Sequence, residues 1–228
     1  MKHIQKYLAE FVYGGIDGCI TTFAVVAGAI GASMDISVIL ILGFANLVAD
    51  GFAMSVGAYL SAQSDRKMYH KFRKGEYAQI KHEPNQEREE VRQIYIKKGF
   101  EGELLEQVVE VICSDEHRWV DEMMKNEHEL NEEKKSSFMI GLATFISFNL
   151  IGFIPISLYL LDYIRPMDIN LFFWTSVLTG LGFIVVGSLK AFITKENPIK
   201  GIIETVSLGA IAASLAYYLG FFIDGIIN

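Results

Sequence analysis

Five apolar runs constrain this chain most, because a run of about 20 apolar residues is long enough to cross a bilayer as a helix. The runs cover roughly residues 11–34, 36–62, 138–161, 169–189 and 201–223. Of the 228 residues, 51% are hydrophobic. The sequence therefore predicts an all-α polytopic membrane protein with five transmembrane helices.

The charged residues gather between the second and third runs. Residues 65–135 contain 14 of the 20 Lys and Arg residues and 18 of the 27 Asp and Glu residues. We therefore expect three parts: residues 1–64 form transmembrane helices 1 and 2, residues 65–135 form an inserted cytoplasmic module of three helices, and residues 136–228 form transmembrane helices 3–5.

Helix boundaries in the inserted segment follow from its turn residues. The helix of the second run continues past its apolar part until Pro84, the next helix ends at Gly99, and Ser114 or Asp115 caps the last, over residues 116–130. The last two helices carry apolar stripes at helical spacing. The stripes are Leu104, Leu105, Val108, Val109 and Ile112, and then Trp119, Val120, Met123 and Met124. We expect them to pack against one another or against a second copy.

Lysine placement predicts the orientation, since cytoplasmic loops are enriched in Lys and Arg. Lys2 and Lys6 precede the first run, and the loop before the fifth run carries Lys190, Lys195 and Lys200. The N-terminus and the inserted segment are thus expected in the cytoplasm and the C-terminus outside. The net charge of −7 gives no sign of nucleic-acid binding. We find no nucleophile–base pair or phosphate loop, so no enzyme activity and no organic cofactor are expected.

An acid, Asp50, interrupts the second apolar run, and Asp17 interrupts the first. Ionisable residues inside a membrane are expensive and usually mark ion pathways. Asn46 and Met54 lie four residues to either side of Asp50, so all three share a helix face. An amide, a carboxylate and a thioether on one face suggest a path for a divalent transition metal. The alternatives are neutral acids hydrogen-bonded between helices and a methionine that only packs.

Small residues four apart crowd the first run, as at Gly14 and Gly18, and predict close helix packing. In the inserted segment, Glu87 and Glu90 share a helix face, and so do Met123 and Glu127. Such acidic faces are usually solvated, and from spacing alone metal binding is the weaker interpretation. His117 and His128 each follow a glutamate and are interpreted as surface residues.

Two segments carry a family resemblance. DGCITTFAVVAGAIGAS and GFANLVADGFAMSVGAYLSAQSD resemble the first two spans of the vacuolar iron transporter family. The resemblance implies a homodimer that exports Fe²⁺, and often Mn²⁺, from the cytosol in exchange for protons. Asp17 and Met54 match pathway residues. Asn46 stands where a glutamate is expected, and Asp50 stands where a glycine is usual.

The resemblance also implies metal binding by the inserted segment. The matching positions are Glu76, Glu87, Glu90, Met123, Met124 and Glu127, while Gln79 replaces an expected glutamate. The short chain is identified as a prokaryotic member, expected in the plasma membrane. An alternative function is a membrane-anchored dimeric metal-binding or sensing protein that transports nothing.

Overall fold

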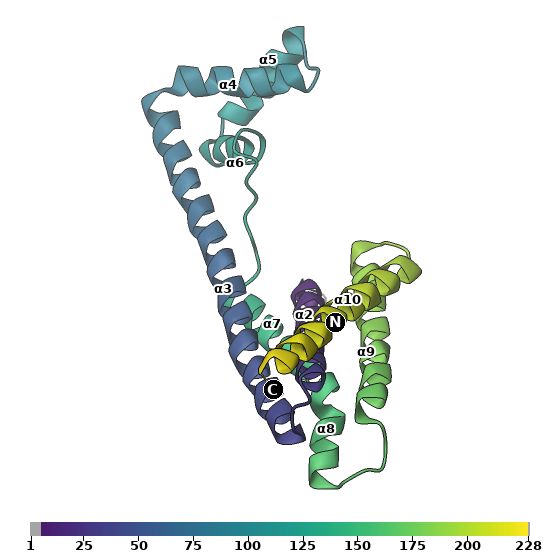
Figure 1. The fold of residues 1–228 in the computed structure, drawn as a ribbon. Coiled ribbons are helices and arrows are strands. Elements are labelled where there is room, and N and C mark those ends of the chain that lie inside the picture. The colour runs from purple at the N-terminus through teal and green to yellow at the C-terminus, as the bar shows by residue number, and fades with distance from the viewer. Residues whose placement is uncertain (1–5, 228) are drawn as a thin grey trace. The chain divides into compact units, whose positions relative to one another are not determined.

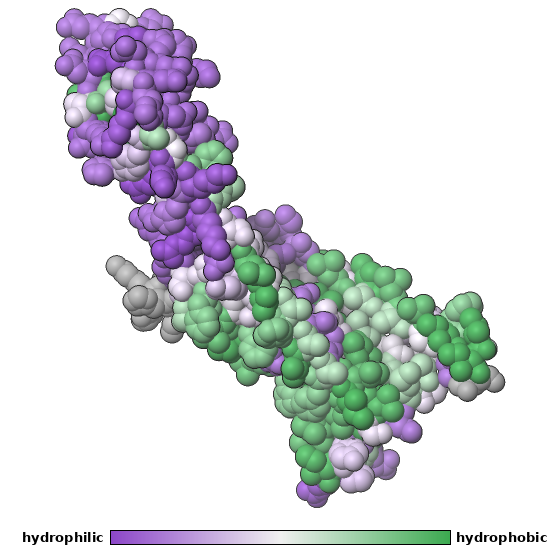
Figure 2. Space-filling model, turned by 90° about the vertical axis from the view of Figure 1, so that its left-hand side faces the viewer, coloured by the Kyte–Doolittle hydropathy of each residue, from purple (hydrophilic) through white to green (hydrophobic). Residues whose placement is uncertain are grey.

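The computed structural model describes residues 6–227, and these residues form α-helices joined by short connections, with no strand among them (Figure 1). The chain divides into two compact units. The apolar unit comprises the residues up to Leu60 and those from Lys135 onward, and the charged unit is Ser61–Lys134. Figure 2 shows a mostly hydrophobic surface on the apolar unit and a mostly hydrophilic surface on the charged unit.

The apolar unit consists of membrane-length helices. Its elements are α2 (Leu8–Gly31), the first part of α3 (Ile36–His82), α7 (Ser137–Gly152), α8 (Ile154–Ile164), α9 (Leu171–Thr194) and α10 (Pro198–Ile227). Among the described residues, four helices are long and apolar enough to span a membrane, and α7 with α8 makes up to five. The predicted all-α membrane architecture is confirmed at this level.

The third predicted span is not one straight helix. The structure breaks the run at Phe153 and bends α8 by 50° from α7. Pro155, in the first turn of α8, explains the break because proline has no N–H to donate and its ring clashes with the preceding turn. The predicted span over 138–161 is therefore a bent pair of helices and not one helix.

Helix α2 is the centre of the apolar unit, because it packs against α7, α9 and α10. A Cβ atom at Gly18 would overlap the backbone of Phe148 in α7, and one at Gly31 would overlap the backbone of Tyr217 in α10. The small residues of α2 thus let neighbouring backbones approach closely, as their spacing predicts.

The charged unit contains the end of α3 together with α4 (Pro84–Lys97), α5 (Gly102–Cys113) and α6 (Glu116–Asn126). The predicted boundaries at Pro84 and Gly99 are confirmed, and Gly99 takes the positive φ of 91° that glycine favours. Asp115 caps α6, because its carboxylate accepts a hydrogen bond from the Arg118 N–H at 2.8 Å. However, α6 ends at Asn126, four residues before the predicted end.

One side-chain core holds the charged unit together. It joins both predicted stripes to residues of α3 and α4: Tyr69, Ile80, Val91, Leu105, Val109, Ile112, Trp119, Val120, Met123 and Met124. Leu104 is an exception to the predicted stripe, since 57% of it is exposed. Successive helix residues point about 100° apart, so burying Leu105 turns Leu104 towards solvent.

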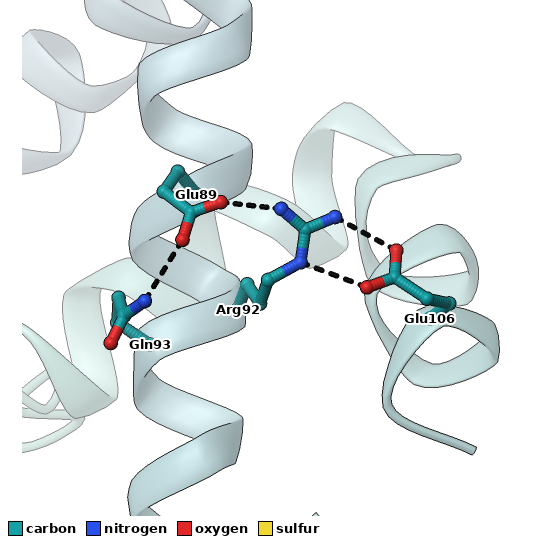
Figure 3. Close-up of polar contacts among 4 residues, drawn as sticks. All are labelled: Glu89, Arg92, Gln93 and Glu106. Atoms are coloured by element: carbon teal, nitrogen blue, oxygen red, sulfur yellow. Dashed lines mark hydrogen bonds and ion pairs between the residues drawn. The ribbon is translucent and has the colours of Figure 1, made fainter. Parts of the chain in front are cut away.

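An ion-pair network joins α4 to α5 on the surface of the charged unit (Figure 3). The Arg92 guanidinium donates two hydrogen bonds to the Glu106 carboxylate, at 2.9 and 2.8 Å, and also pairs with Glu89. Hydrogen bonds from Gln93 and then Arg92 lower the pKa of Glu89, and those from Arg92 lower the pKa of Glu106. The bidentate geometry fixes the relative orientation of two short helices.

Candidate metal-transport site

The two acids of the apolar unit lie on different helices but near each other. Asp17 in α2 is partly buried, Asp50 in α3 is exposed, and their charges are close enough to interact. Asn46 connects the same two helices, because its Nδ2 donates to Thr22 Oγ1 at 3.2 Å and to Thr21 Oγ1 at 3.4 Å. The structure thus gathers Asp17, Asn46 and Asp50 at the α2–α3 contact.

Met54 lies one turn beyond Asp50 and is partly buried against the apolar core that contains Leu47 and Phe148. The neighbouring side chains Val48 and Phe52 are each more than 60% exposed. Asp50 is therefore an exposed acid within an apolar stretch of α3. An exposed charge there is unfavourable against lipid unless something covers it.

A second acidic cluster lies in the charged unit, where the acids are buried instead. Glu76 of α3 and Glu87 of α4 are each only 1% exposed. One carboxylate oxygen of each, Oε2, is buried and has no hydrogen-bond partner among the described residues. A buried carboxylate without a partner is costly, because burial removes the water that stabilises its charge.

Neighbouring charges show that this cluster includes further glutamates. Burial, and after it the carboxylates of Glu90, Glu76 and Glu127, together raise the pKa of Glu87 to about 7. Burial also raises the pKa of Glu127, where His128 opposes and Glu76 and Glu90 add to the effect. Four predicted ligands from three different segments therefore meet in one place that favours either a proton or a cation.

His128 also lies in this cluster, contrary to its interpretation as a surface residue. Its side chain is 20% exposed, and its Nε2 is 2.7 Å from Glu76 Oε1. His128 does not follow the helical face pattern, because α6 ends at Asn126. His117 is exposed, as expected, and its Nδ1 contacts the Tyr77 hydroxyl at 2.5 Å.

The model of one protein family, described as the VIT family, matches residues 8–221 of the chain. The chain belongs to the VIT family. Curated relatives agree with this. A protein named vacuolar iron transporter from Plasmodium berghei is 30% identical over 95% of this chain and 82% of its own length. Vacuolar iron transporter 1 of Arabidopsis thaliana is 30% identical over 96% of this chain and 87% of its own length.

Family membership confirms the resemblance and makes this chain a member of a family of metal transporters. The two predicted methionine ligands of this VIT chain, Met123 and Met124, are fully buried within the side-chain core. Glu90 of the acidic cluster accepts a hydrogen bond from Gln86 at 3.1 Å, and Gln79, which replaces an expected glutamate, is exposed. Spacing could not have found the cluster, because its members come from α3, α4 and the turn after α6.

Proposed function

We propose that this VIT chain exports Fe²⁺ or Mn²⁺ from the cytosol in exchange for protons. It acts as a homodimer in a prokaryotic plasma membrane, with its N-terminus and charged unit in the cytoplasm and its C-terminus outside. Glu76, Glu87, Glu90, Glu127 and the pair Met123 and Met124 collect the metal. Asp17, Asn46, Asp50 and Met54 pass it across the membrane.

The observation that carries the membrane step is the position of Asp50. A charged side chain at the bilayer centre costs about 3 kcal/mol or more. Asp50 is nevertheless exposed in a single chain, on an apolar stretch of α3. A second copy that covers this face removes the acid from lipid and gives it an ion to bind. This is the support for a pathway between two subunits.

Proton coupling follows from the chemistry of carboxylates in a dry environment. Two nearby acids, Asp17 and Asp50, disfavour carrying two negative charges together. They bind either protons or a dication, and the two states exclude each other. Passage of a metal ion in one direction therefore releases protons that move in the other direction.

A liposome assay tests this function. The purified chain is reconstituted into vesicles with an acidic lumen, and Mn²⁺ entry and proton exit are followed with two dyes. We expect Mn²⁺ entry to drive proton exit, and both Asp17→Asn and Asp50→Asn to slow entry by roughly 10–100-fold, as loss of a metal-site group typically does. Asp35→Asn, in the exposed turn before α3, is the matched control and leaves entry unchanged.

Wild-type rates in both pathway variants would overturn the proposed path. A second candidate function, a membrane-anchored metal sensor, is favoured by the buried glutamates of the charged unit, which need no transmembrane path. That function predicts Mn²⁺ binding to the reconstituted protein with no entry into the vesicles under any pH gradient.

A further inference from the structure

His128 occupies the turn that follows α6, where the backbone directs its ring towards the acidic cluster. The His128 N–H donates to Met123 O at 3.2 Å, and the Leu130 N–H donates to Met124 O at 2.8 Å. Between them Glu129 takes a positive φ of 54°. The Phe72 ring lies 4.8 Å from the imidazole, centroid to centroid, and limits its orientation.

Three potential ligand atoms converge at this turn. His128 Nε2 lies 2.7 Å from Glu76 Oε1 and 3.9 Å from Glu127 Oε2. One ligand atom from each of these three residues lies within 4.8 Å of the other two. Ligand atoms around one transition-metal ion, each bound at about 2.0–2.2 Å, have separations of this order.

A hydrogen bond with His128 does not satisfy the cluster. It uses one oxygen of Glu76, whereas the other oxygen, Oε2, remains buried and unpartnered. Glu87 Oε2 is likewise buried and unpartnered, and its carboxylate is close enough to Glu76 to interact with it. Acceptors without donors at a place lined by three carboxylates match a bound cation, because a cation satisfies all of them at once.

We propose that His128 is a nitrogen ligand that binds a divalent transition metal through Nε2, together with Glu76 and Glu127. This inference rests on the proposed metal-collecting role of the charged unit and adds an imidazole to a site otherwise made of carboxylates and methionines. The metal replaces the hydrogen bond between His128 and Glu76. An imidazole ligand favours Fe²⁺, Co²⁺ or Zn²⁺ over Ca²⁺ and Mg²⁺, which prefer oxygen ligands.

Electron spin-echo spectroscopy of Mn²⁺ bound to the full-length protein in detergent tests this ligand directly. A coordinated imidazole nitrogen produces ¹⁴N modulation, and labelling histidine with ¹⁵N replaces that modulation. We expect the modulation in the wild type and its loss in His128→Ala, with Mn²⁺ affinity lower by roughly 10–100-fold. His117→Ala is the control, because His117 also follows a glutamate, and it keeps both modulation and affinity.

The outcomes separate the two proposals. If the wild type binds no Mn²⁺ in the charged unit, the metal-collecting function fails. If Mn²⁺ binds without nitrogen modulation, or the modulation persists in His128→Ala, only the histidine ligand is overturned. If His128→Ala binds Mn²⁺ too weakly to observe while its Trp119 fluorescence remains native, the proposal is supported.

Discussion

The apolar unit and the charged unit differ in how closely their helix backbones approach. In the apolar unit, glycines such as Gly18 and Gly31 bring helix backbones together beside two clusters of buried side chains. In the charged unit, large side chains such as Leu105 and Trp119 fill one core. The difference follows from the solvent. Moving an apolar side chain from water into a core is favourable, whereas moving it from lipid into a core gains little.

The acids of the two units also differ in their exposure to solvent. Asp50 is exposed on an apolar helix, while Glu76 and Glu87 are buried in a unit with a polar surface. Each acid lies where a charge is least stable without a partner. Each candidate site is therefore marked by acids whose surroundings destabilise the charged form, and not by the number of acids.

Shortening a core side chain of the charged unit has the largest expected effect on stability. Leu105→Ala lowers the free energy of unfolding by about 2–5 kcal/mol, because it removes buried contacts and leaves a cavity. The measurement is urea unfolding of the full-length protein, followed by Trp119 fluorescence in a Trp174→Phe background. Leu104→Ala, next in sequence but 57% exposed, is the control. Equal losses in both variants would contradict the assigned core.

Enlarging a small residue is the corresponding test of the apolar unit. Gly18→Ala introduces a methyl group against the backbone of Phe148 and costs about 1–3 kcal/mol, as overpacking does. Gly57→Ala is the control, because a Cβ there meets no atom within 4 Å. Thermal unfolding in detergent compares the two. A stable Gly18→Ala variant would show that α2 and α7 do not pack this closely.

The pH dependence of the stability of the charged unit tests its buried acids. We expect a smaller change in stability here than from either packing substitution. Folding raises the pKa of Glu87 from 4.5 to about 7, so protonation favours the folded state. Stability without metal is therefore greatest below the unfolded value and falls as pH rises through about 7. Glu87→Gln removes this loss, and its unfolding midpoint in a chelating buffer exceeds that of the wild type near pH 8. A midpoint below the wild type at that pH would contradict the assignment.

The stabilisation from the surface network of Arg92 has the opposite pH dependence. We expect it to change the unfolding midpoint least. The hydrogen bonds from Arg92 lower the pKa of Glu106, so their stabilisation is present above the unfolded value of 4.5 and is lost as pH falls through the folded value. Glu106→Gln lowers the unfolding midpoint slightly at neutral pH and leaves it unchanged in acid. Added salt reduces the difference, since the pair is exposed.

Most of the fold could be predicted because it depends on local features. Apolar length predicted the spans, and Pro84 and Gly99 predicted helix ends. Pro155 broke the third span because one residue outweighed the apolar run around it. Leu104 was placed in the core because adjacent leucines are equally apolar, and only packing decides which of them is buried.

The acidic cluster of the charged unit was less predictable, because it depends on contacts between distant segments. Glu76, Glu87 and Glu127 are brought together by the folding of three helices, and the family resemblance indicated them where spacing did not. His128 was missed because helical periodicity was extended past the end of α6. Its signal in the sequence, a histidine beside a matched glutamate, was present but was interpreted through the wrong geometry.

The most direct test of the account measures Mn²⁺ binding and Mn²⁺ entry on the same two variants, Asp50→Asn and Glu76→Gln. Asp50→Asn is predicted to bind Mn²⁺ in the charged unit like the wild type and to slow entry by roughly 10–100-fold at every Mn²⁺ concentration. Glu76→Gln is predicted to lose that binding yet to keep entry at saturating Mn²⁺. The account would be contradicted if Asp50→Asn transported normally, or if Glu76→Gln abolished entry at saturation.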